Sequence, residues 1–306
     1  MTRERRSATS APNLVSAHAE AQRAGRVWLI TGASRGLGRA FAEAALAAGD
    51  RVVALSRTVG ALDTLAVAHR DRLMAFSLDV TDRAAVFAAV GEAVRRFGRL
   101  DIVVNNAGFL SMGMVEEFTE AQAREQLEVN FFGALWVSQA VLPTLREQGS
   151  GHIVQISSIG ALGGFPTTGL YSASKFALEG MSEALAAEVA EFGVKVTIVE
   201  PGGYWTDLYT RGLVAAEPQP QYAGLRAELE RRFAENSVDS PPELAAQALM
   251  RLVDSADPPL RLLLGSMVYD LAFEVSRRRM DVWASWEEVS RAAERATPAP
   301  EEPVAS

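Results

Sequence analysis

The 306-residue sequence contains no cysteine and only three histidines. Without cysteine the chain can form no disulfide bond, thiolate nucleophile or cysteine-ligated metal site. His18, His69 and His152 lie far apart in the sequence, so they do not form a short metal-binding motif. We therefore expect no metal site.

The sequence also lacks long apolar runs and an excess of positive charge. No run reaches the roughly 18 residues of a membrane-spanning helix, so no membrane span is predicted. The formal net charge of −8 gives no electrostatic reason to bind nucleic acid or an anionic membrane. Residues 1–24 contain arginines without the apolar centre of a secretory signal. We predict a disordered N-terminal tail on a cytoplasmic protein, with an organellar transit peptide as the alternative.

Short apolar runs rich in β-branched residues alternate with longer amphipathic segments. The predicted strands are 26–31, 51–56, 73–78, 100–105, 151–157, 194–200 and 260–264. The predicted helices are 36–48, 59–69, 82–97, 121–147, 171–192 and 241–254. Strands that are apolar on both faces and separated by helices are typical of a parallel sheet covered on both sides. The pattern predicts an α/β fold: one doubly wound Rossmann-type domain over residues 25–265, with a seven-stranded parallel sheet.

Two segments interrupt or follow this alternation. Residues 203–240 contain prolines, aromatic residues and charges without a strand pattern, and we expect an inserted lid over the open end of the sheet. Residues 266–295 are expected to form a helical C-terminal extension whose aromatic residues pack on the domain. Residues 296–306 are rich in proline and alanine, which predicts a disordered tail.

A glycine-rich turn, TGASRGLG from Thr31 to Gly38, follows the first predicted strand and leads directly into a helix. Glycines let the backbone turn tightly and approach a pyrophosphate, and a helix N-terminus offers free N–H groups. The spacing differs from G-x-G-x-x-G. It resembles the TGxxxGxG cofactor motif of the short-chain dehydrogenase/reductase family, with Gly32, Gly36 and Gly38 at the matching positions.

Three further matches to that family follow in order at predicted strand ends. Asp79 stands where the family contacts adenine, and Asn106-Ala107-Gly108 belongs to an NNAG motif. Pro201-Gly202 with Thr206 matches the PGxxxT segment that contacts the nicotinamide amide. The resemblance covers roughly residues 25–265 and implies a nicotinamide cofactor. The expected cofactor-binding residues are Thr31, Gly32, Ser34, Arg35, Gly36, Leu37, Gly38, Ser56, Arg57, Asp79, Val80, Asn106, Ala107, Gly108, Tyr171, Lys175, Pro201, Gly202 and Thr206.

The end of the second predicted strand bears on the choice of cofactor. An acidic residue there would bind both ribose hydroxyls and repel a 2′-phosphate. The sequence has Ser56 and Arg57 instead, and Arg35 lies in the glycine-rich turn. Guanidinium groups form charge-assisted hydrogen bonds to phosphate, so we predict NADP(H) rather than NAD(H). The alternative is that both arginines are solvated surface charges.

A tyrosine and a lysine, Tyr171 and Lys175, are spaced one helical turn apart. A free tyrosine has a pKa near 10, and a nearby cation is expected to lower it. Lysine provides a compact point charge, whereas arginine presents a planar fork. Only Lys175 and Lys195 among the 30 basic residues are lysines, which favours a specific role for Lys175.

The family resemblance adds Ser158 and Asn130 to this pair. Ser158 lies thirteen residues before the tyrosine, and Asn130 lies within a predicted long helix. The resemblance implies a catalytic tetrad of Asn130, Ser158, Tyr171 and Lys175. In it the tyrosine exchanges a proton with the substrate oxygen, the serine binds that oxygen, the lysine holds the ribose, and the asparagine supports a proton relay. The alternative for Asn130 is a hydrogen-bonded core residue or a bend in the helix.

Substrate contacts are expected from loops beyond the strand ends. The candidates are apolar and aromatic, which predicts a bulky hydrophobic ketone or secondary alcohol. The residues chosen as substrate contacts are Leu110, Phe165, Leu170, Tyr204 and Trp205, and the wider set adds Phe109, Met112, Met114, Gly163, Leu208 and Tyr209.

The resemblance implies an oxidoreductase that transfers hydride between NADP(H) and such a substrate. The hydroxysteroid-dehydrogenase-like branch is the most similar one, although steroid, polyketide and lipid carbonyls all suit the expected pocket. A redox-neutral isomerase or cyclase and a non-catalytic NADP-binding regulator are the alternatives. By resemblance only, we expect a homodimer or homotetramer formed through the helices that hold Asn130 and Tyr171.

Overall fold

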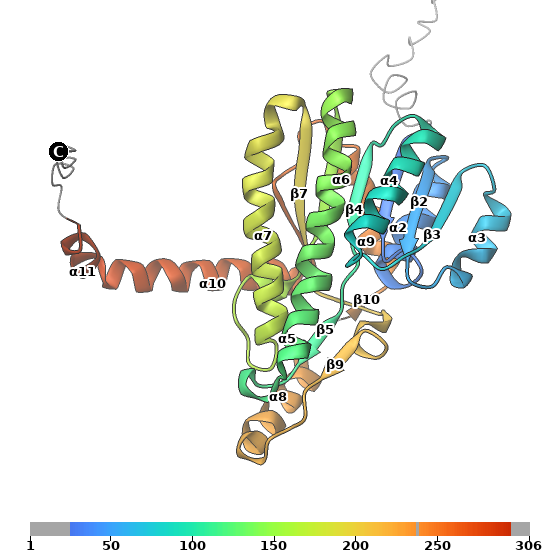
Figure 1. The fold of residues 1–306 in the computed structure, drawn as a ribbon. Coiled ribbons are helices and arrows are strands. Elements are labelled where there is room, and N and C mark those ends of the chain that lie inside the picture. The colour runs from blue at the N-terminus through green and yellow to red at the C-terminus, as the bar shows by residue number, and fades with distance from the viewer. Residues whose placement is uncertain (1–24, 237–238, 295–306) are drawn as a thin grey trace, which may run out of the picture.

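The computed structural model describes residues 25–236 and 239–294. Its centre is a seven-stranded parallel sheet in the order β3-β2-β1-β4-β6-β7-β11 (Figure 1). The strands are β1 Val27–Thr31, β2 Arg51–Ser56, β3 Leu73–Ser77, β4 Ile102–Asn105, β6 Gly151–Ile156, β7 Val194–Pro201 and β11 Arg261–Leu264. The predicted fold class and sheet are confirmed. The strand order reverses between β1 and β4, where open α/β sheets form a crevice at the carboxyl ends of their strands.

Helices cover both faces of the sheet (Figure 1). The helices of the described chain, in order, are α2 Gly36–Ala47, α3 Asp63–Ala68, α4 Arg83–Phe97, α5 Glu120–Leu127, α6 Gly133–Gln148, α7 Gly169–Val189, α8 Ala223–Asn236, α9 Pro242–Val253, α10 Ser266–Ser285 and α11 Glu287–Ala292. Local sequence fixes some of their ends. Helix α4 begins after Asp82, whose carboxylate accepts a hydrogen bond from the Ala85 amide, and it ends at Gly98 in the left-handed conformation.

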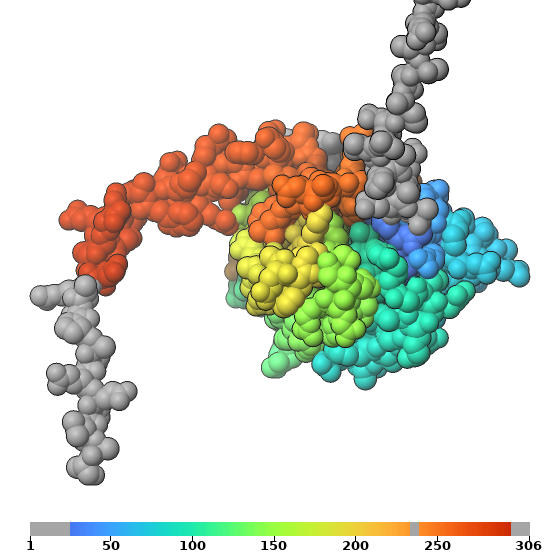
Figure 2. Space-filling view, turned by 90° about the horizontal axis from the view of Figure 1, so that it is seen from above, coloured from blue at the N-terminus to red at the C-terminus, as the bar shows by residue number. Residues whose placement is uncertain are grey.

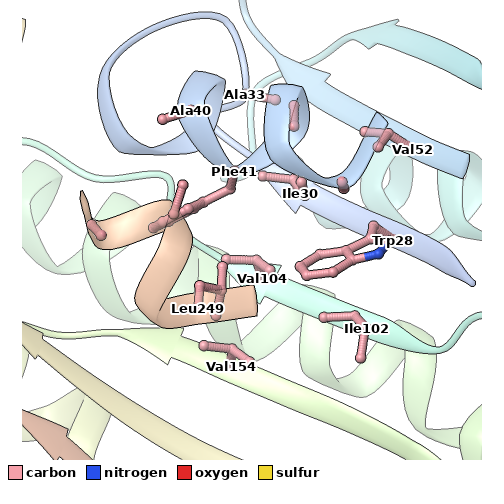
Figure 3. Close-up of a cluster of buried hydrophobic side chains, with 14 of the residues drawn as sticks. Trp28, Ile30, Ala33, Ala40, Phe41, Val52, Ile102, Val104, Val154 and Leu249 are labelled. Carbon is pink, nitrogen blue, oxygen red and sulfur yellow. The ribbon is translucent and has the colours of Figure 1, made fainter. Parts of the chain in front are cut away.

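Two apolar cores fill the space between the sheet and its helices. Because neighbouring side chains on a strand point to opposite faces, Trp28 and Ile30 of β1 pack toward α2 and α9, where Phe41 and Leu249 meet them (Figure 3). Leu29 lies in the other core, with side chains from α4, α6 and α7. Burial on both faces explains why the strands are apolar throughout rather than alternating.

The segment 203–240 contains three short strands, although the sequence predicted none. They are β8 Gly203–Tyr204, β9 Leu213–Ala215 and β10 Asp239–Ser240. Strand β9 pairs with β5, Leu110–Met112, and β10 pairs with β8. Strands of two or three residues are too short to show a period-2 pattern, which is why the sequence did not reveal them. Strand β9 and Arg226 of α8, which pairs with Glu117, connect this segment to the loop that follows β4.

The C-terminal extension is helical, but the expected packing of its aromatic side chains on the domain is not found. Helix α10 leaves the body and runs outward (Figures 1 and 2). The side chains of Tyr269, Phe273, Trp283 and Trp286 are between 49% and 67% exposed. Buried Val268 anchors the start of α10, and Arg279 farther along donates a hydrogen bond to the Leu162 carbonyl. The aromatic residues predicted packing on the domain, but the sequence could not show that helix α10 extends beyond the body.

The two predicted tails, 1–24 and 296–306, lie outside the described residues. Within the described ranges, no helix combines the length and the apolar character required to cross a membrane. In the same part of the chain, no three histidine or acidic side chains gather in a way that could hold a metal ion.

Candidate active site

A cavity of about 1090 Å³ opens at the carboxyl ends of the central strands. It combines the glycine-rich turn, the ends of β2 and β4, the start of α7, the segment after β7 and the start of α10. Most predicted cofactor residues line it; Thr31 and Gly38 do not. Of the predicted catalytic residues, Ser158, Tyr171 and Lys175 line the cavity and Asn130 lies behind its wall.

Thr31 and Gly38 shape the turn from beneath. The Thr31 hydroxyl accepts hydrogen bonds of 2.9 Å from the amides of both Asn106 and Ala107, which ties the turn to the end of β4. A Cβ at Gly38 would collide with the carbonyl oxygen of Gly32. Gly32 itself has a φ of +65°, which L side chains rarely adopt. The glycines are therefore required by the backbone geometry of this turn.

The first helix presents an uncapped N-terminus to the cavity. Helix α2 begins at Gly36, and no side chain caps its first N–H groups. Such a terminus binds anions because the free N–H groups and the helix dipole both favour negative charge. A Cβ at Gly36 would lie 3.3 Å from the Thr206 side chain, so glycine keeps this approach open. The turn fits the pyrophosphate of a dinucleotide.

Serine and arginine side chains surround the end of β2. The Ser56 hydroxyl donates a 2.8 Å hydrogen bond to that of Ser34, and Arg35 and Arg57 line the same part of the cavity. Arg35 also lies 3.7 Å from a carboxylate oxygen of Asp207. The pair is solvent-exposed, so this ion pair is weak and Arg35 can exchange it for another anion.

Helix α7 brings the tyrosine and the lysine together, as the spacing predicts. Both side chains are buried, and the Lys175 ammonium lies 5.7 Å from the centre of the Tyr171 ring. The ammonium donates a 2.8 Å hydrogen bond to the carbonyl oxygen of Ile156 at the end of β6. Ser158 follows that strand, and its hydroxyl oxygen accepts a 3.0 Å hydrogen bond from the Gly160 amide. This bond leaves the hydroxyl hydrogen to be donated elsewhere, and Tyr171 is a hydrogen-bond partner of Ser158.

Asn130 lies in a π-helical turn, Glu128–Phe132, which interrupts the helix predicted over 121–147. Its amide is fully used: Oδ1 accepts from the Phe109 amide at 3.0 Å, and Nδ2 donates to the Phe109 carbonyl at 3.0 Å and to Ser174 at 3.1 Å. A Cβ at Gly108 would lie 3.1 Å from Asn130 Oδ1 and 3.8 Å from Lys175 Nζ. Gly108 therefore keeps the space between these two residues open. Single-turn π-helices inside α-helices are frequent at functional sites.

The family model for short chain dehydrogenases matches residues 26–212. The chain belongs to the short-chain dehydrogenase/reductase family. It is 39% identical to "Oxidoreductase BOA17" of Botryotinia fuckeliana over 88% of this chain and 99% of that protein. It is 35% identical to the 3-ketodihydrosphingosine reductase of Bacteroides thetaiotaomicron, over 79% of this chain and 89% of the relative.

Solved structures agree with this assignment. A short-chain dehydrogenase from Streptomyces avermitilis has a TM-score of 0.83 and 42% identity, over 89% of this chain and all of that one. A short-chain dehydrogenase from Burkholderia cenocepacia, solved with NADP, has a TM-score of 0.68 and 27% identity, over 86% of this chain and 98% of that one. The protein is thus an oxidoreductase of the short-chain dehydrogenase type.

In this short-chain dehydrogenase, burial outweighs the expected effect of the lysine on the tyrosine. Burial raises the pKa of Tyr171 to about 12, and a hydrogen bond with Ser158 only partly opposes it. Burial also lowers the pKa of Lys175 to about 8, opposed by the charge of Glu179. The expected lowering of the tyrosine pKa is not found, because the ammonium faces the ring and bonds to Ile156. Near neutral pH the phenol is therefore protonated.

The predicted substrate contacts divide into two groups. Leu110, Phe165 and Tyr204 line the cavity of the dehydrogenase, whereas Leu170 and Trp205 do not. Trp205 is 65% exposed, so it points away from the cavity. Sequence reasoning missed several lining residues because they come from the lid and from the start of α10, which no motif marks. They are Arg211, Val214, Arg226, Leu229, Met267 and Leu271.

Two charged residues tie the segment 203–240 to the loop that follows β5. Glu117 follows β5 and is buried, and Arg226 of α8 contacts both of its carboxylate oxygens at 2.6 and 2.7 Å. The Arg226 guanidinium and the Gln219 amide hold the pKa of Glu117 down at about 2. The ion pair explains how a segment with few buried apolar side chains is fixed over the site.

Proposed function

We propose that this short-chain dehydrogenase reduces bulky hydrophobic ketones with NADPH, and oxidises the matching secondary alcohols in reverse. One observation supports the proposal best. The hydroxyl groups of Ser158 and Tyr171 and the ammonium group of Lys175 line the same cavity as the glycine-rich turn. The cavity of about 1090 Å³ is large enough for a dinucleotide and a substantial substrate together.

Each side chain has a defined task in the proposed reaction. Bound NADPH would supply the hydride that reaches the carbonyl carbon. Tyr171 gives its hydroxyl proton to the carbonyl oxygen, which suits a phenol that is protonated near neutral pH. Ser158 donates a hydrogen bond to the same oxygen while negative charge develops there. Lys175 holds the nicotinamide ribose, and Asn130 fixes the loop at Phe109 and the helix at Ser174 around it.

The preference for a bulky hydrophobic substrate is supported by the side chains around the reacting groups. Leu110, Phe165 and Tyr204 from three different segments, with Met267 and Leu271 of α10, form the apolar part of the cavity. One relative, 35% identical to this chain, is a 3-ketodihydrosphingosine reductase, and its name describes a ketone reductase. Steroid-, polyketide- and lipid-like ketones all suit an apolar pocket of this size.

The preference for NADPH is supported by the positive and hydroxyl-bearing side chains at the end of β2. Arg35, Arg57, Ser34 and Ser56 provide donors for a 2′-phosphate. Replacing Arg57 with aspartate is expected to weaken NADPH binding by more than about tenfold while NADH binding is kept or improved. Arg70→Asp, the same charge change at an exposed position outside the cavity, is the control. Equal losses for both nucleotides would contradict the assignment.

The function is tested by following NADPH consumption with a panel of bulky ketones and NADP⁺ reduction with the matching alcohols. Turnover that depends on Tyr171 supports the ketoreductase. Tight nucleotide binding with a rearranged product and no net oxidation would favour the isomerase alternative, and binding without any turnover would favour a regulator. A homodimer or homotetramer remains a proposal, which the molar mass in solution will test.

A further inference from the structure

A cluster of buried charges lies behind Lys175 and is not used in the mechanism above. Glu179 is one helical turn after Lys175 on α7, so both side chains lie on the same face of that helix. Both are buried, at 5% and 6% exposure. A charged carboxylate is costly to bury without partners, so its contacts must explain why it is there.

Three other elements supply those contacts. The Ser157 hydroxyl at the end of β6 donates a 2.5 Å hydrogen bond to Glu179. Arg261 of β11 forms an ion pair with Glu179 and a second one, at 2.9 Å, with Glu200 of β7. Glu183, on the exposed side of α7, also pairs with Arg261. We refer to Glu179, Glu200 and Arg261 as the buried charge cluster.

Glu179 has no cation of its own, because the Arg261 guanidinium is shared among the carboxylates of Glu179, Glu183 and Glu200. Burial and the charge of Glu179 raise the pKa of Glu200, which favours its neutral form and leaves Glu179 as the charged carboxylate of the buried pair. The ammonium of Lys175 is the next cation along the same helix face, and its hydrogen bond to Ile156 goes to a neutral carbonyl. Burial alone would favour the neutral amine, because a charged group in a medium of low polarity loses its hydration.

We propose that Glu179 is a positioning residue that keeps Lys175 charged near neutral pH, and that Ser157 and Arg261 hold its carboxylate in place for this purpose. The proposal rests on the proposed function for the effect on turnover, but not for the effect on the lysine itself. Outside the buried charge cluster, Tyr171 lies one turn before Lys175, and the pKa of that tyrosine is raised in part by the charge of Tyr209. The expected direction agrees with the two opposing effects on the pKa of Lys175: burial lowers this pKa, and the charge of Glu179 raises it.

Glu179→Gln is the decisive variant. Glutamine has nearly the same shape and can still accept the Ser157 hydrogen bond, while Arg261 retains Glu200 and Glu183, so the protein is expected to fold. Losing one nearby negative charge should lower the pKa of Lys175 by about one unit. Activity that needs the charged ammonium is then lost at a correspondingly lower pH, and kcat/KM at pH 8 falls roughly fivefold.

The sequence makes a direct measurement simple, because Lys175 and Lys195 are its only lysines. Protein labelled with [ε-¹³C]lysine gives two signals, which Lys195→Arg assigns, and the pH titration of the Lys175 signal reports its pKa without any cofactor or substrate. The matched control is Glu183→Gln. It removes another carboxylate that pairs with Arg261, but one at an exposed position. Its Lys175 pKa should equal that of the original protein.

A lower Lys175 pKa in Glu179→Gln, with no shift in Glu183→Gln, supports the proposal even if no ketone is ever reduced. An unchanged Lys175 pKa in a folded Glu179→Gln variant overturns it, whatever happens to turnover. If the glutamine variant does not fold, Glu179→Asp decides. Withdrawing the carboxylate by one methylene should lower the pKa in the same direction by less than half as much, and no shift would again overturn the proposal.

Discussion

Helices α7 and α10 are nearly equal in length, with 21 and 20 residues, yet they show opposite relations between polarity and burial. Nine residues of α7 are buried, and most of them are polar or charged. Helix α10 projects from the body (Figure 2) and has a single buried residue, while its aromatic side chains are exposed. The comparison teaches that burial in this protein follows the available partners and not the apolar character of the helix.

Partners explain why the polar side of α7 can be buried. Ser174 and Ser182 donate to the carbonyl oxygens of Tyr171 and Leu178 within the helix, at 2.7 and 2.6 Å. Lys175 and Glu179 bond to β6 as described above. Small hydroxyl side chains let the helix lie close to the sheet. Polar groups that lose their contact with water there form hydrogen bonds within the protein instead. On helix α10, by contrast, the described residues from 276 onward are all exposed.

The largest expected difference between the two helices concerns a hydroxyl group. Tyr171→Phe on α7 should reduce turnover by about 10²- to 10⁴-fold, because the proton donor is lost. Tyr269→Phe on α10 removes the same atom from a side chain that is 55% exposed and should leave turnover unchanged. Steady-state rates with NADPH and one accepted ketone provide the measurement. Similar rates for the two variants would break the comparison and remove Tyr171 from its proposed role.

The next difference concerns stability. Leu178→Ala on α7 empties a site that is 1% exposed and should lower the free energy of unfolding by about 2–5 kcal/mol. Met280→Ala on α10 truncates a side chain that is 54% exposed and should change it by less than about 0.5 kcal/mol. Urea unfolding of both variants measures the pair. A loss of several kcal/mol for Met280→Ala would mean that α10 has a packing partner.

The same contrast separates what the sequence could and could not predict. The sheet and the position of Tyr171 and Lys175 were predictable, because apolar strands and a one-turn spacing depend on local sequence alone. The π-helical turn at Asn130 was not, since it depends on bonds to Phe109 and Ser174 that the fold brings together. The raised tyrosine pKa depends on burial, which spacing cannot show.

A smaller effect is expected on the outer face of α7. Gly180 is exposed there, and a Cβ would meet nothing within 4 Å. Gly180→Ala should raise the free energy of unfolding by about 0.5–1 kcal/mol, because alanine loses less backbone freedom on folding. The control is Gly133→Ala in α6, where a Cβ would lie 2.6 Å from Val80 Cγ2 and should destabilise the protein. Destabilisation by Gly180→Ala would show that this face of α7 is covered by another surface.

The smallest effect is expected from removing residues 280–306, the part of the chain beyond Arg279. Arg279 donates a 2.8 Å hydrogen bond to the Leu162 carbonyl and marks the outer limit of the contacts between α10 and the body. Because Trp283 and Trp286 are more than 60% exposed, their removal takes away no core and should change the Tm by less than about 2 °C. Calorimetry and the molar mass in solution measure the result. A large fall in Tm accompanied by a smaller assembly would mean that a second copy of the chain covers these side chains, and burial on α10 would then follow its partners as it does on α7.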